Sequence, residues 1–309
     1  MGKIIQKIVP NLWFDKEAKE AAEFYTSVFQ NSDIGTEVKY GNAGQEIHGQ
    51  KPGSTMTVDF EIENFRFLGL NGGPIFKFNP SISFFVLCET DDEIENLWKK
   101  LSEKGEILMP LDAYEWSPKY GWLQDKFGLN WQLMGREKKK YDQKIFPLLF
   151  FTGERQGKAE EAIKFYTSVF KNSEITGILH YGEENDFARN GVKHAEFRLE
   201  DQVFMAMDSG MENNYPFNEA ISFIVKCRDQ QEIDFYWEKL TEGGDPKAQI
   251  CGWLKDKFGV SWQIVPEGME RMLNYADKEK AQRAMEAVLK MKKFDMNLLK
   301  RAVEKSPLT

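Results

Sequence analysis

The sequence predicts an α+β protein made of two tandem copies of one domain and a C-terminal helical hairpin. Three observations support this prediction: a domain-sized internal repeat, a βαβββ pattern that occurs twice in each copy, and a run of helix-forming residues after the second copy. The repeat is much longer than the roughly 20–50 residues of a solenoid unit, so we expect each copy to fold as a domain.

The repeat consists of three blocks that recur in the same order. Residues 20–34 and 161–175 are identical at 11 of 15 positions. Residues 121–134 and 252–265 are identical at 9 of 14 positions. A further pair of matching blocks lies between them, at 79–106 and 218–245. Three blocks in one order indicate a duplication, and the domain bounds that follow are 1–136, 143–267 and, for the helical extension, 268–309.

The first half of each copy is predicted to be one βαβββ unit. In the first copy, a strand over residues 8–14 leads into a helix over 17–29, where the apolar residues from Ala21 to Val28 follow helical spacing. Three strands are expected next, near residues 34–40, 55–62 and 66–70.

The second half repeats this plan. A strand over 82–88 precedes a helix over 91–101, which Thr90 or Asp91 can cap. Residues 120–124 and 129–134 then form a hairpin in which Gly128 allows the turn.

The tail has the pattern of a helical hairpin. Asp277 can cap a helix over 278–293, and Asp295 can cap a second helix. Each helix has one apolar face, so the hairpin is expected to cover its own domain or to contact a second subunit.

The blocks EAxxFYTSVFxNS, NxxISFxVxC and GWLxDKFGxxWQ resemble the PhnB-like branch of the glyoxalase/bleomycin-resistance (vicinal oxygen chelate) superfamily, over residues 3–265. The resemblance implies tandem glyoxalase-like domains, in which paired βαβββ units form a cupped sheet with helices on its outer face. It also implies either a monomer with an internal pseudo-dimer or a homodimer, because single-copy relatives pair.

The resemblance also implies four positions per copy at which relatives hold a metal ion. Here these positions hold Pro10 and Pro147, Ser81 and Ala220, Gln132 and Gln263, and residues near Gly69 and Ala206. Proline and alanine cannot bind a metal, and one glutamine per copy provides too few ligands. The three histidines do not occupy matching positions. The expectation is therefore no metal, and no glycine-rich loop indicates a nucleotide cofactor either.

Strand alternation and one insertion predict the binding residues. The first copy has an aromatic insertion at 109–120 that the second lacks, and such side chains often line small-molecule pockets. The candidate ligand-binding residues are Ser83, Gln132, Tyr114, Trp116, Trp122 and Gln263. Cys88 and Cys227 match between the copies and are expected to be buried and unreactive.

Composition limits the function further. A net charge of −8 without a basic face argues against nucleic-acid binding, and no apolar run suits a membrane span. Three cysteines without CxxC spacing favour the cytoplasm. The first hypothesis is a metal-free protein that binds an unidentified small molecule in the cup of the first copy. The alternatives are a lyase, isomerase or transferase without a tightly held metal, and a scaffold whose tail recruits a protein partner.

Overall fold

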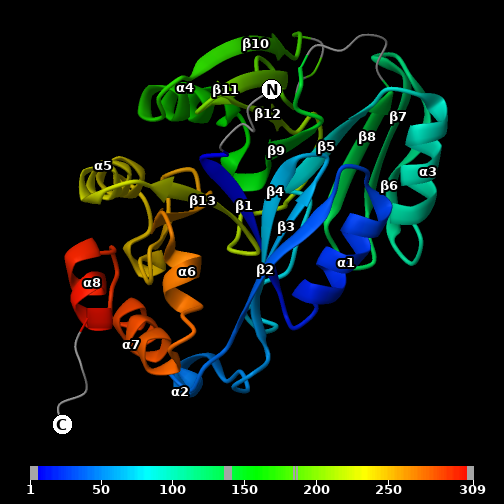
Figure 1. The fold of residues 1–309 in the computed structure, drawn as a ribbon. Coiled ribbons are helices and arrows are strands. Elements are labelled where there is room, and N and C mark those ends of the chain that lie inside the picture. The colour runs from blue at the N-terminus through cyan, green and yellow to red at the C-terminus, as the bar shows by residue number, and fades with distance from the viewer. Residues whose placement is uncertain (1–5, 136–140, 184, 186, 305–309) are drawn as a thin grey trace.

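The computed structural model describes residues 6–135, 141–183, 185 and 187–304, and its fold is α+β, as predicted (Figure 1). The first copy comprises β1 (Ile8–Phe14), α1 (Ala18–Val28), β2 (Asp33–Lys39), α2 (Gln45–His48), β3 (Thr55–Ile62), β4 (Phe65–Asn71), β5 (Ile82–Cys88), α3 (Asp91–Leu101), β6 (Glu106–Tyr114), β7 (Ser117–Gln124) and β8 (Asn130–Gly135).

The second copy follows a similar order, with a 3-10 helix in the place of β6 and, among its described residues, without a counterpart of α2. It comprises β9 (Ile145–Phe151), the 3-10 helix η1 (Gly153–Arg155), α4 (Ala159–Val169), β10 (Glu174–His180), β11 (Val192–Leu199), β12 (Gln202–Asp208), β13 (Ile221–Cys227), α5 (Gln230–Thr241), η2 (Pro246–Ala248), β14 (Trp253–Lys255) and β15 (Ser261–Pro266). The tail contains α6 (Met269–Leu273), α7 (Lys278–Leu289) and α8 (Met296–Glu304).

The two sheets each combine strands of both copies. The first sheet has the order β14-β15-β13-β1-β4-β3-β2, and the second has the order β10-β11-β12-β9-β5-β8-β7-β6. In the centre of the first sheet, β1 runs antiparallel to β13, with Asn11 opposite Ser222. In the second sheet, β9 runs antiparallel to β5, with Leu148 opposite Ser83. The first half of each copy therefore shares a sheet with the second half of the other copy.

The two halves of one copy pack through the faces that carry the helices. Phe67 of the first sheet meets Phe84 of the second with ring centroids 4.9 Å apart. Both rings are fully buried in the main hydrophobic cluster, together with Tyr25 of α1 and Trp131 of β8. The large cores thus form within each copy, whereas the opposite, concave faces of the sheets form between copies. We call these faces the first cup and the second cup, after their sheets.

The repeated DKFG block forms a turn that joins helix and sheet. The Asp125 carboxylate accepts hydrogen bonds from the backbone N–H groups of Phe127 and Leu129, at 2.8 and 3.1 Å. It also accepts one from the indole N–H of Trp131, at 2.8 Å. Asp256 has the equivalent contacts in the second copy. The recurrence of this block is explained by structure rather than by chemistry.

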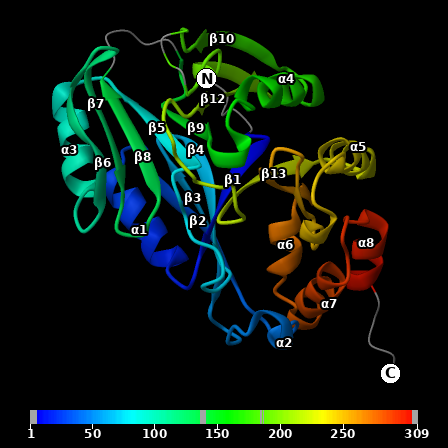
Figure 2. The same ribbon diagram turned by 180° about the vertical axis from the view of Figure 1, so that it is seen from behind.

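The tail covers the first cup. Figures 1 and 2 show α7 beside α2 and between α2 and α8, with all three tail helices at the end of the molecule away from α3. The backbone N–H groups of Cys251 and Gly252 donate to the carbonyls of Met291 and Lys292, at 2.8 and 2.7 Å. Phe294 follows and is 3% exposed in the main cluster. Among the described residues, no helix is long and apolar enough to cross a membrane.

Candidate functional site

The first cup encloses a cavity of about 300 Å³, with walls from both copies and a cover from the tail. Strands β1 to β4 and α2 of the first copy form one side, and β13 to β15 of the second copy form the other. The cover consists of α6 and α7, whose Leu273 and Met285 pack against Val38 and Met56 of the sheet. This volume lies at the lower end of the range typical of small-molecule sites.

Polar side chains on the floor of the cavity form a short chain of hydrogen bonds. The Gln263 amide donates to the Ser222 hydroxyl at 2.9 Å, and the Asn11 amide approaches the same hydroxyl at 3.4 Å. No described residue donates to the Gln263 side-chain carbonyl, which borders the cavity. It is therefore available to accept a hydrogen bond from a ligand.

Charged side chains lie at one side of the cavity. The Arg66 guanidinium contacts the Asp59 carboxylate at 2.5 Å and lies 3.8 Å from the Glu270 carboxylate. Lys226 of β13 also lines the cavity. Burial and the nearby Arg66 charge both lower the pKa of Lys226.

Tyr40 and His48 close the far end of the cavity and bond to the backbone. The Tyr40 hydroxyl donates to the Asn71 carbonyl at 2.5 Å, and burial raises its pKa to about 12. The His48 ring packs against the Tyr40 ring, with centroids 4.4 Å apart and the planes tilted by 36°, and its Nδ1 accepts a hydrogen bond from the Gln50 N–H. Both side chains shape the wall, and neither is placed as a proton donor or base.

The second cup holds most of the residues that the sequence singled out. The Tyr120 hydroxyl donates to the Gln132 carbonyl at 2.7 Å, and the Gln132 amide donates to the Ser83 hydroxyl at 2.9 Å. Trp122 is 8% exposed and packs edge-on against Phe150. These side chains do lie together beside an apolar cluster, but the buried indole N–H of Trp122 has no hydrogen-bond partner among the described residues.

The aromatic insertion extends β6 and β7 into a long hairpin. Tyr114 and Trp116 stack with ring centroids 5.0 Å apart, and the Tyr114 hydroxyl donates to the Pro110 carbonyl at 3.0 Å. Trp116 is 54% exposed. Of the six candidate residues, Gln263 lines the described cavity, four lie on strands of the second sheet, and Trp116 lies in the turn between β6 and β7.

A family model described as 3-demethylubiquinone-9 3-methyltransferase matches residues 6–134 and again residues 143–265. The chain belongs to this PhnB-like family, in two tandem copies. A PhnB protein from Bacillus cereus is 38% identical over 42% of this chain and 100% of its own, with a TM-score of 0.39. A protein from Staphylococcus aureus is 32% identical over 43% of this chain and 98% of its own, with a TM-score of 0.18.

Glyoxalase I from Zea mays shares the fold of this PhnB-like chain. It is 12% identical, covers 82% of this chain and 89% of its own, and has a TM-score of 0.52. This likeness shows a glyoxalase-like fold, which the chain builds from two repeats. No curated protein matches the chain.

In the first strand of each copy of this PhnB-like chain, the side chains that face the cup are not the expected ones. Val9 and Asn11 line the first cup, while Ile8 and Leu12 belong to the main core, so Pro10 faces the helices. In the second copy Phe146 and Leu148 face the cup and Pro147 does not. The expected placement of Pro10 and Pro147 in the cups was wrong. The cup positions hold Asn11 and Leu148, and in the described residues no group of three or more His, Cys, Asp or Glu side chains is arranged for a metal.

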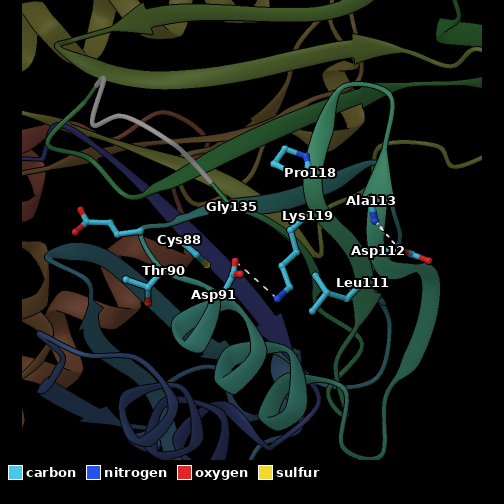
Figure 3. A pocket seen from close by; sticks show the side chains of 10 residues that line it. Cys88, Thr90, Asp91, Leu111, Asp112, Ala113, Pro118, Lys119 and Gly135 are labelled. Atoms are coloured by element: carbon cyan, nitrogen blue, oxygen red, sulfur yellow. Dashed lines mark hydrogen bonds and ion pairs between the residues drawn. The ribbon is translucent and has the colours of Figure 1, made fainter.

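A second hollow of about 440 Å³ lies outside the cups, between α3 and the β6–β7 hairpin (Figure 3). Its lysine, Lys119, pairs with Glu95 at 2.5 Å and lies 3.8 Å from Asp91. Because Lys119 already has carboxylate partners at the surface, this hollow is a weaker candidate than the first cup.

Proposed function

We propose that this PhnB-like protein binds a small, largely apolar molecule in the first cup, without a bound metal. The observation that carries the proposal is the contrast between the two cups. They come from the same sequence blocks, and yet the cavity lies in the first cup, where the tail covers it.

The register of the sheets identifies the side chains that make this difference. Val9 lies opposite Ile224 in the first sheet, and Phe146 lies opposite Phe85 at the equivalent place in the second. Larger rings therefore occupy the second cup at the level where the first is hollow, and they belong to its apolar cluster. Substitution of small for large side chains at a fixed backbone position opens space for a ligand.

The sequence placed the binding site in a cup of the first copy. The proposal places it in the first cup, whose walls come from both copies. It also gives the tail a role, because α6 and α7 form one wall of the cavity. An apolar face used in this way is not free to recruit a partner, so the scaffold hypothesis is less favoured. The enzyme hypothesis is less favoured because it relied on Gln132 and nearby tyrosines, which are bonded to each other.

A neutral probe tests the site. We expect 1-octanol to bind the wild-type protein with one-to-one stoichiometry in isothermal titration calorimetry. Ile224→Phe introduces the ring that the second cup already holds and should abolish this binding, whereas the matched change Phe85→Ile in the second cup should leave it intact. Wild-type binding that survives Ile224→Phe, or no binding at all, contradicts the proposal.

The metal-free part is tested separately. Protein purified without added metal should bind 1-octanol with the same affinity before and after treatment with a chelator. Elemental analysis should find less than one metal ion for every ten chains, an order-of-magnitude threshold for a tightly held ion. Stoichiometric metal whose removal weakens binding refutes this part of the proposal.

A further inference from the structure

The ammonium group of Lys226 has no ionic partner in the cavity. Lys226 lies on β13 opposite Val265 of β15, with its side chain toward the cup. Among the residues that the structure describes, none forms a hydrogen bond or ion pair with this ammonium group, whereas Arg66 has Asp59 and Glu270 beside it. One positive charge in the cavity is therefore left unbalanced at close range.

The duplication provides an internal comparison for these charges. In the second sheet, Leu87 lies opposite Met134, which is the place that Lys226 holds opposite Val265. Arg66 and Val203 also occupy equivalent positions. Leu68 pairs with the first strand of its copy as Met205 does, and Arg66 and Val203 each lie two residues before these residues. The first cup thus carries two cations at positions where the second cup carries aliphatic side chains.

The half-buried ammonium group of Lys226 favours an anionic ligand, because a ligand that enters the cavity displaces water from this charge. Moving a charge out of water has a free-energy cost unless an opposite charge compensates it. Arg66 adds repulsion, whereas Glu270, Asp59 and Glu267 attract the ammonium group without forming an ion pair with it. An anionic group on a ligand would remove this cost, and a neutral ligand would not.

We propose that the natural ligand of the first cup is an apolar molecule with one anionic group, of the carboxylate class, and that this group pairs with Lys226 beside Arg66. The inference rests on the proposed function, because it names the class of molecule that the same cavity binds. The apolar part of the ligand lies against Ile224 and the methionine and leucine side chains of the tail. The anionic group then supplies the partner that Lys226 lacks.

Three probes with the same chain length distinguish this inference from simple apolar binding. Octanoate, 1-octanol and octylamine carry a negative, neutral and positive head group at neutral pH. Because a charge-assisted hydrogen bond is about twice as strong as a neutral one, we expect octanoate to bind at least about ten-fold more tightly than 1-octanol, and octylamine to bind most weakly. Equal affinities for octanoate and 1-octanol overturn the inference but leave the proposed function standing.

Substitution of Lys226 locates the effect. Lys226→Leu installs the residue of the second cup and should bring octanoate to the affinity of 1-octanol, while 1-octanol binds as in the wild type. Lys226→Arg keeps the charge and should retain most of the preference. If octanoate remains preferred in Lys226→Leu, the anion binds elsewhere and the inference fails. If 1-octanol does not bind the wild-type protein, the proposed function itself fails. The comparison of probes on the wild-type protein needs no variant, so a folding defect does not prevent the test.

Discussion

The Tyr25 hydroxyl donates a hydrogen bond of 2.8 Å to the Asp125 carboxylate, across 100 positions of sequence. Tyr25 lies on α1 and covers the first sheet, whereas Asp125 lies in the turn after β7 of the second sheet. The pair therefore connects the two halves of one copy. Tyr166 and Asp256 form the same bond at 2.7 Å in the second copy.

Removing this hydroxyl should destabilise the protein without changing its fold. We expect Tyr25→Phe to lower the free energy of unfolding by about 1–3 kcal/mol, because a buried carboxylate loses one donor. Urea unfolding followed by circular dichroism measures the change. Tyr166→Phe is the matched variant and should lose a similar amount. A Tyr25→Phe protein as stable as the wild type would show that the bond contributes nothing to the joining of the halves.

The two cup glutamines should differ in their structural importance. Gln132 bonds to both Tyr120 and Ser83, whereas Gln263 bonds to Ser222 through its amide alone. Gln132→Leu leaves two buried hydroxyls without partners and should lower the free energy of unfolding by about 1–3 kcal/mol, with a smaller loss for Gln263→Leu. Urea unfolding of both variants checks the order, and a greater loss for Gln263→Leu contradicts it.

The Glu232 carboxylate should make stability depend on acid pH. Burial alone would raise its pKa, but hydrogen bonds from Arg228 and Lys7 outweigh burial and lower the pKa to about 2 from the ordinary value of 4.5. A folded pKa below the unfolded one gives stabilisation that is fully present above about pH 4.5 and is lost as the pH falls toward 2. Glu232→Gln should therefore cost about 1–2 kcal/mol at neutral pH, a value reduced for partial solvent screening.

Urea unfolding of wild type and Glu232→Gln at a series of pH values tests this dependence. The difference in the free energy of unfolding between the two proteins should shrink steadily below pH 4.5. A difference that stays constant down to pH 2.5 would mean that ionisation of Glu232 is not the cause.

Phe294 should hold the tail on the first cup. Its ring packs beside Gly252, where an added Cβ would lie 2.4 Å from the ring, so the contact is close. Phe294→Ala should let the tail detach more often, which hydrogen exchange at the amides of Cys251 and Gly252 measures, since both donate to the tail. Exchange there should rise about ten-fold or more, from the loss of a buried ring. Leu298→Ala, at a position 46% exposed, is the control and should leave exchange near the wild-type rate.

The sequence predicts the elements of this fold well because their signals are local. Helical spacing from Ala21 to Val28 and the DKFG turn each depend on residues near in sequence, and both are found in the structure. The partners of the strands depend instead on which half-sheets meet at their edges. The alternation of side chains along β1 and β13 does not show which strands pair at the sheet edges. The sharing of each sheet between the first half of one copy and the second half of the other is therefore seen only in the structure.

The error at Pro10 has a different physical origin. Six of the seven residues of β1 are buried, on both faces of the sheet. A strand covered on both sides shows no apolar and polar alternation, so its sequence does not reveal which residues face the cup. The cavity itself was missed because it results from differences in side-chain size, such as Ile224 against Phe85. A comparison of the two copies position by position contains that signal.

Each sheet combines strands of both copies, and in a single chain the two cups that result can change independently. A pair of identical chains cannot do this. In a symmetric pair every substitution changes both hollows together, and dilution separates the partners. In one chain the halves meet intramolecularly, at an effective concentration that does not fall with dilution. One cup can then acquire larger side chains and support the assembly, while the other cup evolves independently as a binding site.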